Sequence, residues 1–335
     1  MRRASLKDVA THAGVGLGTA SRVINGNGNV KPVTKEKVLK AIRELNYHPN
    51  NIARSLKTNA TRSLGVLLTD LKNGFDTEII RGIETEAGKT DYSLFLTNTN
   101  KERSKMISCI KNFVEKNVDG IIIIGGEITE EFYTDIKQFH IPLITISCES
   151  NIKPEGQYMS ITIDNEKAAY EVVEYLIQKG HTKIAMISGE KDEMNAGIPR
   201  IKGYQRALEN YKIAFRKEYL IEGNYTFLSG YEKGKQILTL AEKPTAIFAA
   251  SDAMAIGAEK ALLEAGVRIP DEIAIFGFDG LDFAEYVHPS LSTVVQPRYD
   301  MGVLAMRRML EFFTQKEKKE PKIIMKHQLV VRESG

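Results

Sequence analysis

The residues best suited to chemistry in this chain are basic and lie at its start. Residues 1–60 contain eleven Lys or Arg and three Asp or Glu, a formal charge of +8, whereas the whole chain carries +3. A compact cationic segment on a mildly acidic body is typical of a module that binds a polyanion, and nucleic acid is the commonest one. A solvated basic tail is the alternative, but the helical patterning of the segment argues against it.

Arg22 is the side chain best placed to read a base. A helix expected over about residues 17–25 buries Ala20 and Val23, which recur at helical spacing. Arg22 then points away from that face, where a guanidinium can donate to O6 and N7 of guanine in the major groove. A phosphate contact or a solvated charge is the alternative. The residues expected to face DNA here are Leu17, Gly18, Thr19, Ser21, Arg22 and Asn25. For Leu17, a place in the core is an equal alternative.

Three short helices must position these residues. Ser5 and Asp8 have the spacing of a capping box, which begins the first helix. The run Gly14-Val15-Gly16 interrupts the helical pattern before the second helix. A third helix starts near Thr34 and ends before Pro49, since the residue before a proline rarely continues a helix. Two helices joined by a tight glycine turn and braced by a third are typical of an all-α helix-turn-helix head.

The sequence pattern changes after residue 62. Short apolar runs alternate with amphipathic segments over residues 64–146, and the alternation repeats after Asp164. It predicts an α/β body of two doubly wound parallel-sheet subdomains. Ligands bind outside the carboxyl ends of the strands in such sheets. Polar residues follow three of the apolar runs, at Thr69–Asp76, Ser251-Asp252 and Gly277–Asp279, and these segments are candidates for a binding site.

The basic segment also contains five motifs at defined spacing. They are Leu6-Lys7-Asp8-Val9-Ala10, Ala13-Gly14-Val15, Thr19-Ala20-Ser21-Arg22-Val23-Ile24-Asn25, Tyr47-His48-Pro49-Asn50 and Ala53-Arg54-Ser55-Leu56. Together they resemble the head of the LacI/GalR family of bacterial transcription repressors. Gly16 stands where that family usually has a helix-capping Ser, and Gly18 occupies a base-reading position without offering a side chain. The resemblance implies a homodimeric repressor of carbohydrate genes that binds a pseudo-palindromic operator.

Residues 50–62 match the hinge helix and linker of that family, which fold only on DNA. Two hinge helices then lie in the minor groove, and an apolar side chain kinks the duplex between base steps. Leu56 matches that apolar residue, and packing of Leu56 against the body is the alternative. Asn50 is a suitable N-cap after Pro49. The residues implied to contact DNA in this segment are Asn50, Ala53 and Leu56.

For the body, the resemblance implies a periplasmic-binding-protein-like fold with a ligand cleft between two subdomains. The chain is expected to cross between them near Asp164, Gln296 and Lys322. The predicted divisions are 1–49 for the helix-turn-helix domain, 50–62 for the hinge, 63–163 with 297–322 for one subdomain, and 164–296 with 323–335 for the other.

A small sugar or sugar-phosphate effector is the ligand that the resemblance implies for this cleft. Arg200 and Asp279 match positions that hold sugar hydroxyls, and an ion pair between them across the cleft is the alternative. Asp76 stands where relatives usually have an aromatic or similarly bulky residue. The residues expected to bind the effector are Asp70, Asn73, Phe75, Asn195, Arg200, Tyr225, Asp252 and Asp279. Whether the effector is an inducer or a co-repressor stays open.

The segment from Leu291 to Arg307, together with Asn29–Pro32 and Lys243–Phe248, is similar to the catabolite control protein A subgroup of the family. That subgroup uses a seryl-phosphorylated phosphocarrier protein of the sugar phosphotransferase system as co-repressor. The residues implied to contact such a partner are Tyr299, Asp300, Leu304 and Arg307, with Arg307 as the phosphate ligand. A helix face in a homodimer interface or in solvent is the alternative. A small effector is preferred, because pathway-specific relatives share much of this segment.

Other classes of protein are disfavoured by the sequence. It has no nucleophile elbow, Walker loop or paired-carboxylate motif that would indicate a sugar- or nucleotide-processing enzyme. Cys109 and Cys148 lack metal-ligand spacing, and neither a metal nor a cofactor is predicted. The first ten residues lack an apolar stretch and no apolar run approaches a membrane span, so a cytoplasmic protein is expected. A sugar-binding sensor without gene-regulatory action would have a signal peptide and no basic head.

Overall fold

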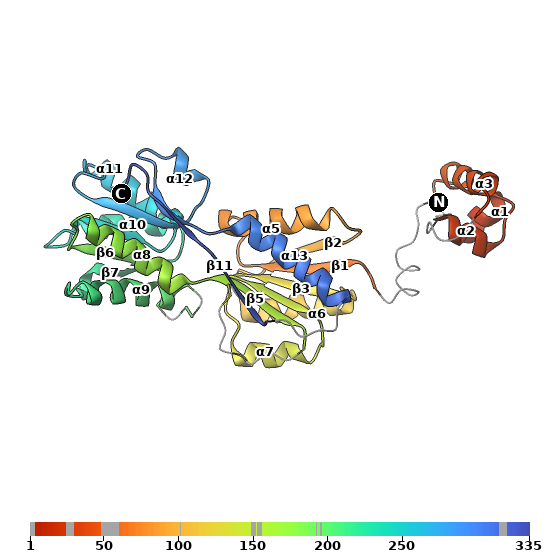
Figure 1. Ribbon diagram of the computed structural model, residues 1–335, viewed down its shortest axis with the longest axis horizontal. Helices are drawn as coiled ribbons and strands as arrows, with labels where there is room; N and C mark the ends of the chain where they lie inside the picture. Colours follow the sequence, from red (N-terminus) through yellow and green to blue (C-terminus); the bar gives the residue numbers. More distant parts are fainter. Residues whose placement is uncertain are drawn as a thin grey trace. The chain divides into compact units, whose positions relative to one another are not determined.

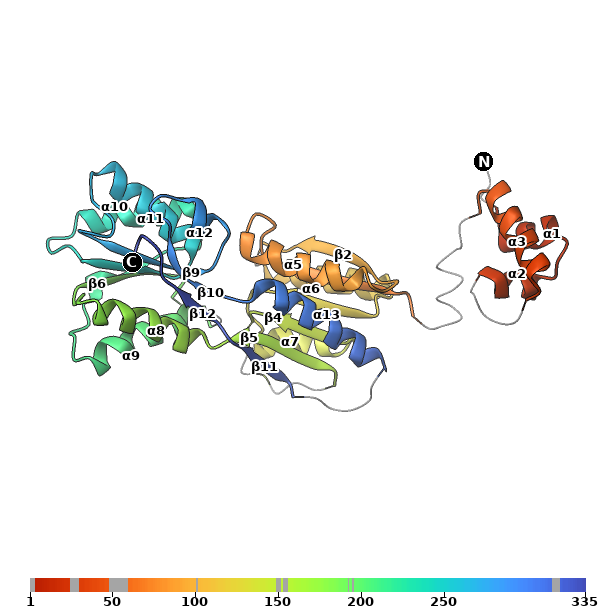
Figure 2. The same cartoon turned by 45° about the horizontal axis from the view of Figure 1, so that its top comes forward.

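The protein folds as two compact units, residues 1–61 and residues 62–335. The computed structural model describes residues 4–24, 30–47, 60–100, 102–148, 152, 156–191, 193–194, 196–314 and 320–335. The first unit is a small helical domain and the second an α/β body (Figures 1 and 2). The two patterns seen in the sequence therefore belong to separately folded units.

The helical unit has three helices around one small core. They are α1 (Leu6–His12), α2 (Leu17–Ile24) and α3 (Pro32–Glu44). Val9, Ala20 and Val38, one from each helix, are fully buried in one cluster. The predicted three-helix head is confirmed. The third helix begins at Pro32 rather than near Thr34, because the fixed φ and missing N–H of proline suit the first helical turn.

The first subdomain of the body contains a six-stranded parallel sheet in the order β11-β5-β4-β3-β1-β2. Its strands are β1 (Ser63–Leu68), β2 (Ser93–Asn98), β3 (Gly120–Ile124), β4 (Leu143–Ile146), β5 (Tyr158–Ile163) and β11 (Lys322–Met325). Its helices are α5 (Gly74–Ala87), α6 (Arg103–Glu115), α7 (Glu130–Lys137) and α13 (Arg298–Thr314). Helices α5 and α13 pack together on one face, and α6 and α7 contribute to a separate core cluster on the other (Figure 1). All of β3 is buried, as expected for a strand covered on both faces.

The second subdomain repeats this architecture with the sheet order β12-β10-β9-β8-β6-β7. Its strands are β6 (Ile184–Ser188), β7 (Leu220–Glu222), β8 (Ala246–Ala249), β9 (Ala274–Asp279), β10 (Ser292–Val295) and β12 (Gln328–Val330). Its helices are α8 (Asn165–Gln178), α9 (Gly197–Asn210), α10 (Phe227–Leu238), α11 (Asp252–Glu264) and the short α12 (Phe283–Tyr286), with a 3-10 turn at Lys217–Tyr219. Helix α8 packs on α9 and α10 on α11. Only β12 among the described strands runs antiparallel to its neighbour. The predicted fold class is confirmed.

The chain crosses between the two sheets three times. The first crossing leads from β5 into α8 at Asp164, and the second joins β10 to α13 through Gln296 and Pro297. The third joins β11 to β12, so it follows Met325 and not Lys322. The predicted crossing near Lys322 is wrong because residues 322–325 pair with β5 and extend the first sheet.

Candidate functional site

The turn between α1 and α2 sets the start of the helix that is expected to meet DNA. Ser5 and Asp8 form the predicted capping box of α1. Gly14 has φ +66°, a conformation that favours glycine, and it redirects the chain after α1. The carbonyl oxygen of Gly16 then accepts hydrogen bonds from the N–H groups of Thr19 (2.9 Å) and Ala20 (3.1 Å). The carbonyl oxygen of Gly16 therefore accepts at the start of α2, where relatives usually have a capping hydroxyl.

Arg22 is exposed on α2, and its Nε donates to the carbonyl oxygen of Gly18 at 3.2 Å. A Cβ at Gly18 would meet no described heavy atom within 4 Å, so the surface beside Arg22 is open. Leu17 is 52% exposed and is not a core residue. Thr19 and Ser21 are partly buried at the margins of this surface. The other predicted DNA contacts, Asn25, Asn50, Ala53 and Leu56, lie outside the described residues.

A cleft lies within the body at the carboxyl ends of strands from both sheets. From the first subdomain it is lined by Thr69, Asn73, Phe75, Asp76, Gly125, Gly126 and Ser147. From the second subdomain and the second crossing it is lined by Asn165, Glu193, Ala196, Arg200, Tyr225, Ser251, Ala253, Asp279, Leu281 and Gln296. Five predicted effector residues are among these: Asn73, Phe75, Arg200, Tyr225 and Asp279. Asn195 lies outside the described residues.

Arg200 is held rigidly on the wall of the cleft that the second subdomain forms, here called the second wall; the first subdomain forms the first wall. Its Nε donates to Oδ1 of Asn165 at 3.0 Å, and its guanidinium also donates to the carbonyl oxygen of Ala250. The guanidinium carbon lies 3.6 Å from the ring centre of Phe278, in cation–π geometry. These contacts fix the orientation of a charge that is only 5% exposed.

Asp279 stands beside Arg200 on the same wall. Its Oδ1 lies 3.8 Å from Nη2 of Arg200 and accepts a hydrogen bond from Nε2 of Gln296 at 2.8 Å. The predicted alternative, an ion pair across the cleft, is therefore corrected: both residues belong to the second subdomain. Burial raises the pKa of Asp279 to about 6, against the opposing effect of Arg200. The φ of Asp279 is +116°, a strained value for a residue with a side chain, and such strain clusters at functional sites.

Tyr225 and Glu193 form a second polar pair in the cleft. The phenol of Tyr225 donates to Oε2 of Glu193. Burial, with the nearby carboxylate, raises the pKa of the Tyr225 phenol well above its ordinary value, so the phenol keeps its proton. Glu193 was not predicted from the sequence, because it lies in a loop after β6 without a recognisable motif.

Asp76 places a buried carboxylate on the first wall. It is 1% exposed and accepts hydrogen bonds from the Thr69 hydroxyl (2.9 Å) and the backbone N–H of Asp70 (3.3 Å). Burial raises its pKa to about 6, and these two hydrogen bonds oppose that rise. The residue that the sequence marked as a departure from its relatives is thus part of the cleft.

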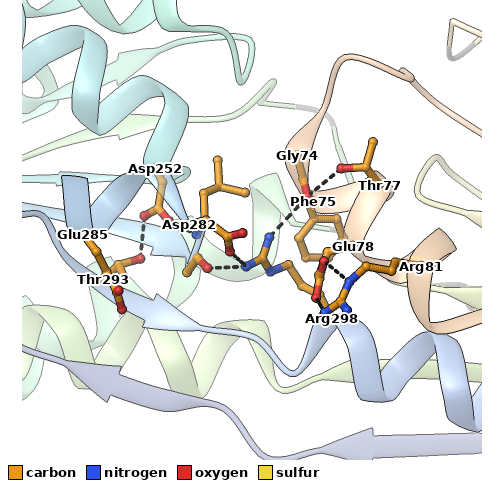
Figure 3. Close-up of polar contacts among 12 residues, drawn as sticks. Gly74, Phe75, Thr77, Glu78, Arg81, Asp252, Asp282, Glu285, Thr293 and Arg298 are labelled. Carbon is orange, nitrogen blue, oxygen red and sulfur yellow. Dashed lines mark hydrogen bonds and ion pairs between the residues drawn. The ribbon is translucent and has the colours of Figure 1, made fainter. Parts of the chain in front are cut away.

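Two predicted effector residues, Asp70 and Asp252, do not line the cleft. Asp70 is exposed, and its Oδ1 accepts from the N–H of Lys72. Asp252 is completely buried at the start of α11, where its carboxylate accepts from the Thr293 hydroxyl (Figure 3). It also accepts from the N–H of Leu281 at 2.6 Å. Their position after a strand indicated a ligand, but the Asp252 side chain turns into the protein and holds the loop after β9.

Arg298 connects the two subdomains at the second crossing. Its Nη1 donates to the carbonyl oxygen of Gly74 in the first subdomain at 3.2 Å. Its Nη2 donates to the carbonyl oxygen of Gly280 and lies 3.3 Å from Oδ1 of Asp282, both in the second subdomain (Figure 3). Arg298 is 8% exposed, so these contacts are shielded from water. The sequence pattern gave no role to this residue.

The predicted phosphoprotein contacts lie on α13. Arg307 is exposed, and its Nε lies 3.1 Å from a carboxylate oxygen of Glu86 on α5. The ring of Tyr299 lies 4.5 Å from the guanidinium carbon of Arg81. Asp300 is exposed and Leu304 is partly buried. The candidate phosphate ligand is therefore already paired with a carboxylate.

Among the described residues, no group of three or more His, Cys, Asp or Glu side chains could hold a metal ion. Burial raises the pKa of the Cys148 thiol far above its ordinary value, so Cys148 is unreactive. None of the described helices is long and apolar enough to cross a membrane.

Family models divide the chain in the same way as the fold. Residues 5–50 match the model of bacterial regulatory proteins of the lacI family, and residues 173–335 match a periplasmic binding protein-like domain. Catabolite control protein A of Priestia megaterium is 38% identical over 98% of each chain.

Solved structures with the same architecture extend the comparison. The lac repressor dimer bound to operator and the anti-inducer ONPF superposes with a TM-score of 0.90 and 26% identity, over 99% of each chain. The complex of the transcriptional regulator CelR with cellobiose gives a TM-score of 0.75 at 28% identity, over 99% of this chain and 100% of that one. The chain combines the DNA-binding head and the ligand-binding body of these regulators, not the machinery of an enzyme. It therefore belongs to the lacI family of bacterial regulatory proteins and is an effector-controlled, DNA-binding transcriptional regulator.

Proposed function

We propose that this regulator is a homodimeric, cytoplasmic repressor of carbohydrate-related genes and that a small sugar-like molecule in the cleft controls its binding to operator DNA. The observation that carries the proposal is the fixed pair of Arg200 and Asp279, set between the amides of Asn165 and Gln296 on one wall of the cleft. A guanidinium and a carboxylate held in this way can each engage two hydroxyl groups. The cellobiose bound to CelR supports a sugar as the ligand class.

Phe75 on the opposite wall complements these polar groups. It is a large apolar side chain that lines the cleft and can cover the apolar face of a sugar ring. A ligand between Phe75 and Arg200 contacts both subdomains and favours the arrangement in which they are close. A ligand shifts the population of two states only by its difference in affinity for them, so these two-sided contacts are the source of control.

In the proposed DNA complex, the exposed surface of α2 enters the major groove. Leu17, Gly18, Thr19, Ser21, Arg22 and Asn25 are the proposed contacts there, with Asn50, Ala53 and Leu56 in the minor groove. Arg22 supplies a bidentate donor for guanine, and the open space beside Gly18 admits close approach of the DNA. Two heads related by a two-fold axis read a pseudo-palindromic operator.

The proposal is tested by measuring operator affinity with and without sugars, sugar phosphates and amino sugars, on a duplex selected from random sequences. At least one compound should change the affinity, and Asp279→Ala should abolish that response while sparing DNA binding without the ligand. Glu209→Ala, which removes an exposed carboxylate from α9, is the control and should respond normally. A normal response in Asp279→Ala, or no response to any compound, would contradict the proposal.

The second candidate effector is a phosphorylated protein that docks on Tyr299, Asp300, Leu304 and Arg307. Its support is the similarity to catabolite control protein A and the exposure of Arg307 on α13. A phosphoserine would have to replace Glu86 as the partner of Arg307, and it offers a greater negative charge. Arg307→Ala should then abolish the response to a seryl-phosphorylated carrier protein and leave every small-molecule response intact.

A further inference from the structure

The cleft has an excess of negative charge. Among the described residues that line it, Asp76, Glu193 and Asp279 are acidic, and Arg200 is the one Lys or Arg. The single guanidinium lies closest to Asp279, at 3.8 Å. Glu193 accepts from the neutral phenol of Tyr225. One positive charge thus faces three carboxylates.

Asp76 is a buried carboxylate, 1% exposed, that faces the cleft without a cationic partner among the described residues. Its two hydrogen-bond donors, the Thr69 hydroxyl and the Asp70 N–H, are neutral. Within the described part of the chain, no Lys or Arg nitrogen lies within ion-pair distance of it. The N-terminal end of α5, where Asp76 lies, stabilises a negative charge without supplying a counter-ion. A buried carboxylate in this position is strongly stabilised when a cation enters the cleft.

A hollow beside the cleft has the same sign. It shares Gly126 and Glu193 with the cleft and is also lined by Glu127, Glu190 and Glu222. Its two cations are already paired: Nζ of Lys191 lies 3.1 Å from Glu222, and Arg103 contacts Glu131 and Asp135. An excess of carboxylates in the cleft and beside it repels phosphates and other anions and attracts cations.

We infer that the effector is a cationic amino sugar, with its protonated amine beside Asp76 and its hydroxyls at Arg200 and Asp279. This inference rests on the proposed function, because it names the ligand of the same cleft. Asp76 lies on the first wall and Arg200 on the second. One ligand would therefore contact both subdomains, through a carboxylate on one side and a guanidinium on the other. The same charges disfavour a sugar phosphate, because its phosphate group would meet three carboxylates and only one guanidinium in the described lining of the cleft.

The test compares matched ligands on the full-length protein by calorimetry and thermal unfolding. The probes are D-glucosamine and D-galactosamine, each with its neutral parent sugar and its N-acetyl derivative, and D-glucose 6-phosphate. The amino sugar of at least one set should bind about tenfold or more tightly than its neutral counterparts, since a hydrogen bond between charged groups is worth more than a neutral one. Acetylation removes the positive charge of the amine, so the N-acetyl sugars test the need for that charge without a change in the protein.

Asp76→Asn should remove the preference for the amine, so that the amino sugar binds no more tightly than its neutral parent sugar. Asp70→Asn removes a neighbouring carboxylate that does not line the cleft, and it should keep the preference. Equal or tighter binding of a neutral sugar or of the sugar phosphate would overturn the inference, and so would binding by no member of the panel. A neutral sugar that binds and changes operator affinity would overturn the inference while supporting the proposed function.

Discussion

Arg298 and Gly280 are joined by a hydrogen bond that spans the two halves of the body. The Nη1 atom of Arg298 donates to the carbonyl oxygen of Gly74 at 3.2 Å, directly before the cleft residues Phe75 and Asp76. The same guanidinium is held in the second subdomain by Gly280 and Asp282. The start of α5 and the loop after β9 are therefore coupled through one side chain.

Replacing Arg298 should weaken this coupling. Arg298→Met keeps much of the apolar stem but removes the guanidinium contacts to Gly74, Gly280 and Asp282, at a cost of about 1.5–3 kcal/mol per charged hydrogen bond. We expect a lower free energy of unfolding in urea and a reduced effect of ligand on operator affinity. Arg268→Met removes an exposed ion pair and is the control. An unchanged ligand effect would show that Arg298 only stabilises the fold.

Arg22→Ala should cost about 1–3 kcal/mol of operator binding and relax the preference at one base pair. The reason is the loss of a bidentate contact to guanine from an exposed position on α2. Binding is measured against a set of operators with single base-pair changes, at several salt concentrations. Arg43→Ala removes one positive charge from an exposed position on α3, so it should lower the affinity for all operator sequences by the same factor. Equal specificity in Arg22→Ala and the parent protein would refute the base contact.

Glu259 should make the stability of the body depend on pH. Its Oε2 is buried without a hydrogen-bond partner among the described residues, and burial raises its pKa to about 7 from an ordinary value of 4.5. The folded state therefore favours the protonated form, and this stabilisation is present below pH 4.5 and lost as pH rises through about 7. Glu259→Met should be more stable than the parent protein at pH 8.5, by about 1–3 kcal/mol, with a smaller gain at pH 5.5.

Urea unfolding at the two pH values measures this difference. Glu264→Met, at the exposed end of the same helix, removes contacts with Lys260 and Tyr231 and should give no such gain. A gain in Glu259→Met that is the same at both pH values would show that packing, not ionisation, is responsible.

Gly302 should tolerate no side chain, because α13 lies against α5 there. A Cβ at Gly302 would stand 2.0 Å from the carbonyl oxygen of Ile79, so the two helices would have to separate. We expect Gly302→Ala to lower the free energy of unfolding by about 1–3 kcal/mol. Gly88→Ala, where a Cβ would have its nearest contact at 3.4 Å, should change stability by much less.

The sequence predicted most reliably what is determined locally. The Ser5–Asp8 capping box and the buried face of α2 follow from spacing within a few residues, and both are present. Arg200 and Asp279 were weighed as a pair across the cleft, although the predicted division at residues 164–296 puts both in one subdomain; the structure shows the pair on a single wall. Local patterns locate the ends of strands but do not give the contacts between side chains that meet there.

The errors have a common physical cause. Asp252 and Asp279 both stand at strand ends, but the Asp252 carboxylate turns inward to Thr293 and Leu281. Glu193 and Arg298 escaped notice because their partners lie far away along the chain. The division predicted at residue 322 falls before the end of β11. The four residues of this strand have no strand pattern of their own and join the sheet by pairing with β5.

The third crossing limits how the two halves of the body can move. Only Lys326 and His327 separate β11 in one sheet from β12 in the other, and Nε2 of His327 is hydrogen-bonded to Glu171 of α8 at 2.7 Å. At about 3.3–3.6 Å per residue, so short a connection cannot lengthen to let the sheets part by translation. The remaining motion is a rotation about an axis near the three crossings. The displacement that a ligand produces at any point therefore grows with its distance from that axis.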